Sequence, residues 1–220
     1  MPDPHRIKNE LLPLLSSPRY ASLLAHRNQF RNPKNPPETA AGIAAATADA
    51  IFKNHPLLDP VEVVELQGPI ELYRAHDGGS GLRTAGTLGR SWFERSVAET
   101  IWQATSNSTG PARQREYMEF IRTANFVLPE WNGMLYIACM TVPAGNRVVV
   151  VRGRGNWKAM RTPTAGSRPG GAPRIGSQGD VLDHLKMMPI PGTQQCVVPL
   201  FNDNWIQPVN QGSARWPFLT

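Results

Sequence analysis

The chain has 220 residues, of which 40% are hydrophobic and 18% charged, so most of it is expected to fold around a sizeable core. Its 19 glycines and 21 prolines predict many turns and irregular connections, and they argue against a helical bundle. The formal net charge of +6 favours anionic partners such as phosphates, nucleic acid or an acidic protein face. A basic surface that only aids solubility is the simpler interpretation of the same charge.

The cysteines and the N-terminus bear on the cellular compartment in which the protein works. Cys139 and Cys196 each lie inside an apolar run, so we expect two buried free thiols and no disulfide framework. The first five residues do not open a signal peptide, and no apolar run has the length of a membrane span. We therefore expect no membrane span, and export would need a route without a cleavable signal.

The first part of the chain predicts helices. Leucines at helical spacing over residues 8–28 indicate short helices that two prolines, Pro13 and Pro18, break into pieces. A polar, proline-rich connector follows at 31–37, and an alanine-rich stretch over 38–54 then predicts a further helix. We expect residues 1–60 to form a helical N-terminal segment that caps the main domain, binds a partner or carries an export address.

Residues 61–220 predict a main domain in which short strands alternate with helices. The turn at 143–146 joins two of the strands, which we expect to pair as a hairpin. The sum is an α+β fold in which separated strands pack as two small sheets that enclose a cleft. The expected strands cover 61–66, 70–75, 91–93, 134–142, 147–151, 195–198 and 205–209, and the expected helices cover 96–105, 112–124 and 181–188.

Residues 152–179 are rich in Gly, Pro, Arg and Ser and predict a long loop on the surface or over a site. Basic side chains in and before this loop can grip phosphates or a macromolecular target, or they can simply be solvated. If they bind nucleic acid or an acidic partner, the chain is a non-catalytic basic binding module. The basic residues concerned are Arg147, Arg152, Arg154, Lys158, Arg161, Arg168 and Arg174.

Five short features together carry a family resemblance. A strand ends in Leu72-Tyr73-Arg74, a glycine-rich loop follows it, and a stretch over 89–98 leads into a helix. Later a Val-Pro-Ala-Gly turn at 142–145 links two strands, and the stretch over 192–199 opens the last core strand. In this order the motifs resemble the ADP-ribosyltransferase-like toxin domains of bacterial effectors, over roughly residues 69–210. The resemblance implies a split β-sandwich around an NAD cleft, preceded here by the helical segment.

The resemblance implies roles for four residues in binding NAD. Arg74 matches the arginine that grips the NAD phosphates and ribose, which suits the permanent charge and planar fork of a guanidinium; its structural alternative is an ion pair with Glu71 or a nearby acid. Ser91 matches the serine that faces the nicotinamide ribose. Trp92 or Phe93 would supply an aromatic wall for the cationic nicotinamide ring, and the alternative is that both anchor the core.

Gln195 is the departure from the family pattern, and we expect it to meet Arg74 across one cleft. The family usually places a glutamate there, whose carboxylate stabilises the oxocarbenium-like sugar as nicotinamide leaves. Three explanations stay open: the chain is an inactive Glu-to-Gln form, it resembles the NAD-glycohydrolase toxins that use a glutamine at this place, or an aspartate such as Asp183 or Asp203 has taken over.

The neighbouring amide, Gln194, is a second candidate for the same position. If Gln195 points into the cleft, strand alternation sends Gln194 and Cys196 to the opposite face. Since a one-residue slip would exchange the two amides, both are kept as candidates.

The resemblance implies an NAD-dependent mono-ADP-ribosyltransferase toxin or effector that uses NAD as substrate and modifies a target macromolecule, foremost a protein. The runner-up is an NAD glycohydrolase toxin, which hydrolyses NAD to nicotinamide and ADP-ribose. Either activity implies a secreted effector that acts in the cytoplasm of a target cell. Such a toxin would need an immunity protein or a chaperone as a partner.

Overall fold

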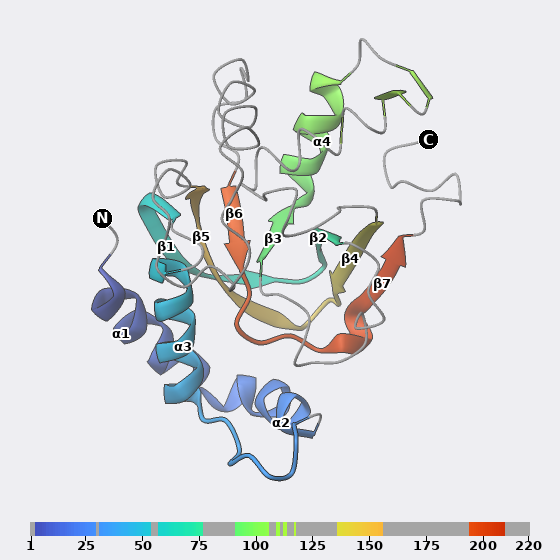
Figure 1. Ribbon diagram of the computed structural model, residues 1–220. Coiled ribbons are helices and arrows are strands. Elements are labelled where there is room, and N and C mark those ends of the chain that lie inside the picture. Colours follow the sequence, from blue (N-terminus) through green and yellow to red (C-terminus); the bar gives the residue numbers. More distant parts are fainter. Residues whose placement is uncertain are drawn as a thin grey trace, which may run out of the picture.

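The chain combines helices with one antiparallel sheet, which confirms the α+β class (Figure 1). This computed structural model describes residues 3–29, 31–53, 57–76, 91–105, 109–110, 112–113, 117, 136–155 and 194–209. The helices are α1 (Pro4–Leu15), η1 (Pro18–Tyr20), α2 (Ala21–Gln29), α3 (Ala40–Lys53), α4 (Arg95–Ala104) and η3 (Asp203–Trp205). The strands are β1 (Leu57–Gln67), β2 (Ile70–His76), β3 (Ser91–Glu94), β4 (Tyr136–Val142), β5 (Arg147–Gly155), β6 (Gln194–Val197) and β7 (Ile206–Val209).

Most predicted elements are present, and several differ at their ends. α1 continues through Pro13, because the proline lies in the last turn and removes a single backbone donor while Leu11 and Leu15 bury their side chains on either side of it. Pro18 does start a separate 3₁₀ turn. The expected helix over 181–188, most of that over 112–124 and the loop after Gly155 lie outside the described residues.

Strand β3 joins two half-sheets. The strand order is β1-β5-β6-β3-β2-β4-β7, so β1, β5 and β6 form one half-sheet and β2, β4 and β7 form the other. The first two residues of β3 pair with β6, as Ser91 with Val197 and Trp92 with Cys196. The last two pair with β2, as Phe93 with Tyr73 and Glu94 with Leu72.

The expected hairpin between β4 and β5 is wrong. β4 pairs with β2 and β7, whereas β5 pairs with β1 and β6, so the turn at 143–146 carries the chain from one half-sheet to the other. The connection from β1 to β2 crosses at the same place, where the Gly68 amide donates to the Asn146 carbonyl at 2.9 Å. A side chain at Gly68 would put its Cβ 2.1 Å from the Pro143 carbonyl oxygen, so only glycine lets the two crossings touch.

Two cores lie on opposite faces of the first half-sheet. In β5, Val148 and Val150 belong to a core shared with β2, β3, β4 and β6, whereas Val149 and Val151 belong to a core shared with α1 and α3. A strand buried on both faces explains the continuous apolar run in the sequence. We call these the inter-sheet core and the helix-side core.

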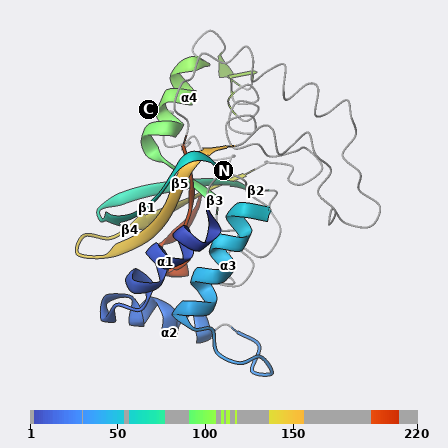
Figure 2. The same cartoon turned by 90° about the vertical axis from the view of Figure 1, so that its left-hand side faces the viewer.

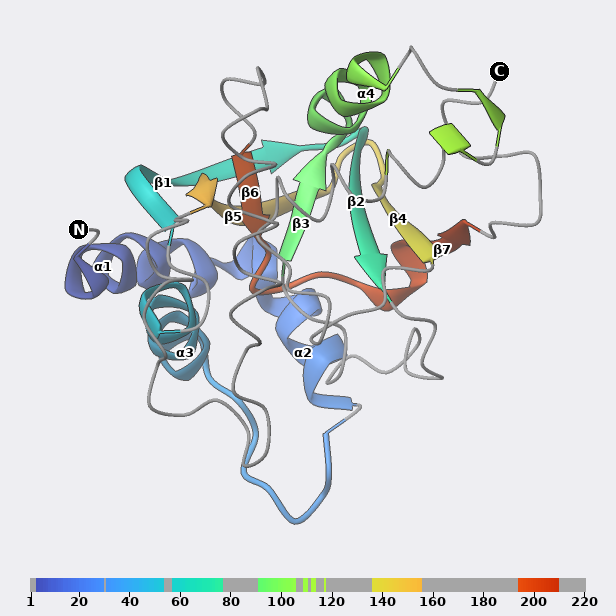
Figure 3. The same ribbon diagram turned by 45° about the horizontal axis from the view of Figure 1, so that its top comes forward.

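The helix-side core joins the N-terminal segment to the sheet. The segment contributes Leu11, Leu15 and Ile43, which pack with Val61 of β1 and Val197 of β6. Figures 2 and 3 both show α1 and α3 on one side of the sheet and α4 on the other. Helices α1 and α3 therefore cover one face of the sheet. The last of these helices ends at Lys53, and β1 begins at Leu57, inside the range 1–60 expected for the helical segment.

Candidate functional site

The three polar residues singled out by sequence come from three consecutive strands of the sheet. Gln195 lies in β6, Ser91 in β3 and Arg74 in β2, and the sheet order places β6, β3 and β2 side by side. These strands are far apart in the chain, so the sheet alone brings them together (Figure 1). This is the arrangement that a shared site at the centre of the sheet requires.

The register puts Arg74 on a different face from the other two. Side chains alternate along a strand, and residues directly opposite in an antiparallel pair share a face. Arg74 therefore lies on the face of Leu72, which pairs with Glu94. Ser91 and Gln195 lie on the opposite face, because Ser91 pairs with Val197, two residues after Gln195. Arg74 and Gln195 are close along the sheet, but they do not face each other across one surface of it.

Gln195 is buried, with 5% of its surface exposed, and lies opposite Gly153 of β5. The next residue, Cys196, belongs to the inter-sheet core, so the expected alternation between them is confirmed. Gln194 pairs with Arg154 at the start of β6, and its side chain lies outside the described part of the chain. The same holds for the side chain of Ser91.

The two aromatic candidates have core contacts. Trp92 is fully buried and meets Phe201 edge-on, with ring centroids 5.8 Å apart. Phe93 is 2% exposed and stacks on Tyr73 at 6.1 Å. These contacts fit the interpretation of both residues as core anchors, and neither ring presents a face to an incoming ligand.

Glu71 has partners other than Arg74. Its carboxylate accepts a hydrogen bond of 2.6 Å from the Tyr73 hydroxyl and lies 3.0 Å from the Arg95 guanidinium. Burial, together with this bond, raises the pKa of Tyr73 well above its ordinary value. Arg74 itself is half-buried and, by strand alternation, lies on the face opposite to Glu71. Glu71 therefore pairs with Arg95, and the alternative of an ion pair between Arg74 and another nearby acid stays a prediction.

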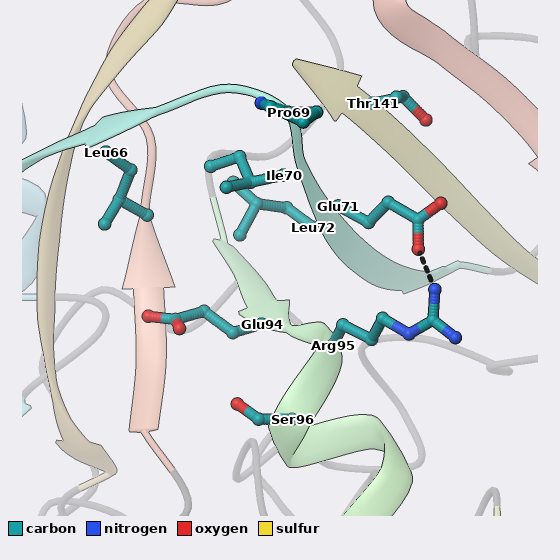
Figure 4. A pocket seen from close by; sticks show the side chains of 9 residues that line it. All are labelled: Leu66, Pro69, Ile70, Glu71, Leu72, Glu94, Arg95, Ser96 and Thr141. Atoms are coloured by element: carbon teal, nitrogen blue, oxygen red, sulfur yellow. Dashed lines mark hydrogen bonds and ion pairs between the residues drawn. The ribbon is translucent and has the colours of Figure 1, made fainter. Parts of the chain in front are cut away.

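A cavity of about 460 Å³ opens beside these residues. Its apolar wall is built by Leu66 of β1 with Pro69, Ile70 and Leu72 at the start of β2 (Figure 4). The polar rim consists of Glu71, Glu94, Arg95, Ser96 and Thr141. The volume is in the range of small-molecule sites. Arg74, Ser91 and Gln195 are not among these lining residues.

Glu94 is the functional candidate that the sequence analysis missed. Figure 4 shows its carboxylate pointing away from the Glu71–Arg95 pair and toward β6. There Glu94 Oε1 lies 3.6 Å from Arg152 Nη1 and 3.9 Å from Cys196 Sγ. Burial and the neighbouring Glu94 charge raise the pKa of the Cys196 thiol to about 12, so that thiol stays protonated. The acids considered from sequence, Asp183 and Asp203, lie near Gln195 in the chain, whereas Glu94 comes from the middle strand of the sheet.

Of the alternative acids, Asp203 lies away from these strands. Asp203 lies against α2, with its carboxylate 3.9 Å from His26 Nε2 and its side chain 7% exposed. Asp183 lies outside the described residues. The explanation in which Asp203 replaces the missing glutamate is therefore not supported by its position.

Two of the basic residues before the long loop have structural partners. Arg147 forms an ion pair with Glu65, and Arg152 lies between Glu62 and Glu94. The basic residues from Lys158 onward, and the side chain of Arg154, fall outside the described ranges. Both cysteines are buried and free, as predicted.

Comparisons with known proteins give no match: no family model fits the chain, and no significant resemblance to a curated protein or a solved structure was found. None of the described helices is long and apolar enough to cross a membrane. Within the described residues, no three His, Cys, Asp or Glu side chains gather closely enough to hold a metal ion. The function must therefore be argued from the motifs and their placement.

Proposed function

We propose that the chain is an NAD-cleaving domain of the ADP-ribosyltransferase type, which transfers ADP-ribose to a target macromolecule. The observation that carries this proposal is the side-by-side order of β6, β3 and β2. Each of these strands holds one of the motifs on which the family resemblance rests. A random set of short matches would have no reason to fall on three neighbouring strands of one sheet.

Arg74 is the phosphate-binding residue in this proposal. A guanidinium is permanently charged and presents a planar fork that fits phosphate oxygens in pairs. Arg74 sits in the second half of β2, just beyond the last pair between β2 and β3, which is Tyr73 with Phe93. Because Arg74 is half-buried and lies just past the paired residues of β2 and β3, its side chain can contact a ligand without a change in the strand.

Gln195 and Ser91 are strand positions on the face opposite to Arg74, so neither shares a surface of the sheet with the proposed phosphate-binding residue. An amide also lacks the charge that favours an oxocarbenium ion. Gln195 therefore does not supply the carboxylate that the reaction uses best, and in this proposal it supports the strands that carry the site.

The acceptor of ADP-ribose is a target side chain in the main proposal and water in the alternative, an NAD glycohydrolase. Incubation with NAD labelled in the ADP-ribose part separates them, since free nicotinamide and labelled protein are read in the same sample. We expect both signals when a lysate of candidate target cells is present. Nicotinamide without labelled protein would establish hydrolysis instead.

The variant Gln195→Glu is the matched comparison, since it changes one amide to the carboxylate that the family usually carries. If the present chain releases nicotinamide, the site works with an amide at position 195. Release by Gln195→Glu alone would show that the present chain is an inactive form. Absence of release from both proteins would reject the proposed function.

A further inference from the structure

We propose that Glu94 is the catalytic carboxylate of this site, facing the ribose carbon from which nicotinamide departs. The proposal rests on the NAD-cleaving function put forward above. It answers the question that Gln195 raises, namely which group carries the negative charge. Four kinds of observation support it: the shared face, the long contacts of the carboxylate, its orientation and the cavity.

Glu94 and Arg74 lie on the same face of adjacent strands. Glu94 pairs directly with Leu72, and Arg74 is two residues further along β2. Two residues of a strand span about 7 Å, which is a distance that one nucleotide-sized molecule can bridge. Gln195 lies on the opposite face, as the pairing of Trp92 with Cys196 shows. A carboxylate at position 94 therefore lies on the same face of the sheet as Arg74, whereas an acid at position 195 would lie on the opposite face.

The carboxylate of Glu94 is less engaged than the other acids around it. Glu71 accepts 2.6 Å and 3.0 Å hydrogen bonds, from Tyr73 and from Arg95. Glu62 is bound by Arg152 at 3.0 Å. Glu94 begins α4 as its N-cap residue, yet its side chain makes no capping hydrogen bond. Within the described part of the chain, its contacts are the long ones to Arg152 and Cys196, at 3.6 Å and 3.9 Å.

Arg152 lies beside one oxygen of this carboxylate. Its side chain is 30% exposed and lies between Glu62 and Glu94, so one cation serves two acids. The Cys196 thiol, held protonated by burial, approaches the same Glu94 oxygen from β6. The second carboxylate oxygen is then available to a ligand. With one third of its side-chain surface exposed, Glu94 is accessible from the cavity without a change of fold.

The cavity beside Glu94 suits the nicotinamide end of NAD. Its wall of Leu66, Pro69, Ile70 and Leu72 is apolar, and its rim carries Glu94 beside Glu71, which pairs with Arg95. The oxidised nicotinamide ring is flat and cationic, so an apolar wall with negative charge at the edge favours it. The volume of about 460 Å³ can hold the ring with its ribose.

The chemical step balances with Glu94 in this position. The bond between ribose C1′ and the nicotinamide nitrogen breaks, and its electron pair leaves with nicotinamide, which departs neutral. C1′ is left as an oxocarbenium ion, and the negative Glu94 carboxylate stabilises the new positive charge. The acceptor, a target side chain or water, gives a lone pair to C1′ and loses its proton to solvent.

The test compares Glu94→Gln, Glu94→Asp and Glu99→Gln in the full-length chain. Glu99 is an exposed acid of α4 that pairs with Arg95, so its substitution controls for the loss of one charge. Nicotinamide release from NAD is measured for each protein. Binding is measured separately with a carbocyclic NAD analogue, whose ribose oxygen is replaced by a methylene so that no oxocarbenium ion can form. Thermal unfolding of each variant checks that it folds.

We expect Glu94→Gln to lower nicotinamide release about 100-fold or more, with analogue binding within about threefold of the unchanged chain. Glu94→Asp should keep part of the activity, and Glu99→Gln should keep all of it. Equal release by Glu94→Gln and the unchanged chain would overturn the assignment. So would a parallel loss of release and analogue binding, which would make Glu94 a binding residue.

Failure of the underlying function gives a different result. If neither the unchanged chain nor Gln195→Glu releases nicotinamide, the NAD-cleaving function falls and the role of Glu94 falls with it. If only Gln195→Glu is active, the function stands and Glu94 alone is rejected as the catalytic carboxylate.

Discussion

Asp203 is a carboxylate buried between the helical segment and the sheet. Its backbone amide donates to His26 Nε2 at 3.3 Å, and its side chain lies near His26 and Arg27 of α2. Neither carboxylate oxygen has a hydrogen-bond partner within the described residues. Burial raises the pKa of Asp203 above its ordinary value of 3.8, although the charges of His26 and Arg27 act in the other direction.

Replacing this acid should change how stability depends on pH. A raised folded-state pKa means that the stabilising contribution is fully present below about pH 3.8 and is lost as the pH rises through the folded pKa. The asparagine in Asp203→Asn cannot ionise. As the pH rises from about 4 toward neutrality, the Tm of this variant should therefore rise relative to that of the unchanged chain, by about 2–4 °C for each kcal/mol of unfolding free energy recovered. Asp49→Asn, an exposed acid of α3, is the control. Parallel Tm curves for Asp203→Asn and the unchanged chain would contradict this account.

The site residues differ in how well sequence could predict them. Arg74 and Gln195 were placed in strands correctly because alternating and apolar patterns identify strands locally. Their relative faces depend on the pairing of Tyr73 with Phe93 and of Trp92 with Cys196, which no local pattern contains. Glu94 was missed for the same reason, since only the sheet order brings it next to Cys196.

At the scale of elements, the crossing between the half-sheets organises the fold. The connection from β1 to β2 and the turn from β4 to β5 touch at Gly68, and each carries the chain into the other half-sheet. The sequence predicted all four strands that flank these two connections. The expected pairing of β4 with β5 was wrong, because a four-residue turn between two strands usually makes a hairpin. The partners that β1 and β2 offer instead lie far away in the chain.

Gly68→Ala should therefore destabilise the protein. Its Cβ would stand 2.1 Å from the Pro143 oxygen and 2.5 Å from the Val142 oxygen, so the crossing would have to open. Overpacking of this kind costs about 1–3 kcal/mol or more in the free energy of unfolding. Gly42→Ala in α3 is the matched control, because its nearest neighbour, Thr39 Oγ1, is 3.4 Å away and alanine favours a helix.

Chemical denaturation of the two variants measures the difference. We expect the midpoint of Gly68→Ala to fall and that of Gly42→Ala to stay or rise. If both substitutions have the same small effect, the two crossings do not touch as described.

At the scale of the whole molecule, the first half-sheet is covered on both faces. The helix-side core lies on one face and the inter-sheet core on the other, and Trp205 packs against both. The N-terminal helices could be predicted from leucine and alanine spacing, but their place on the sheet could not, because the continuous apolar run of β5 does not show which of its faces a helix covers. Helices α1 and α3 cover the helix-side face of the sheet. A ligand must therefore reach Arg74 and Glu94 from the opposite side, where α4 lies (Figure 3).

The most direct measurement is nicotinamide release from NAD by the unchanged chain, by Arg74→Ala and by Lys34→Ala. Lys34 is exposed in the connector between α2 and α3, so its variant removes one positive charge away from the sheet. We predict release by the unchanged chain and by Lys34→Ala, and a loss of about 100-fold or more in Arg74→Ala, because the guanidinium binds the phosphates. Equal release by Arg74→Ala and Lys34→Ala, or no release by any of the three, would contradict the account.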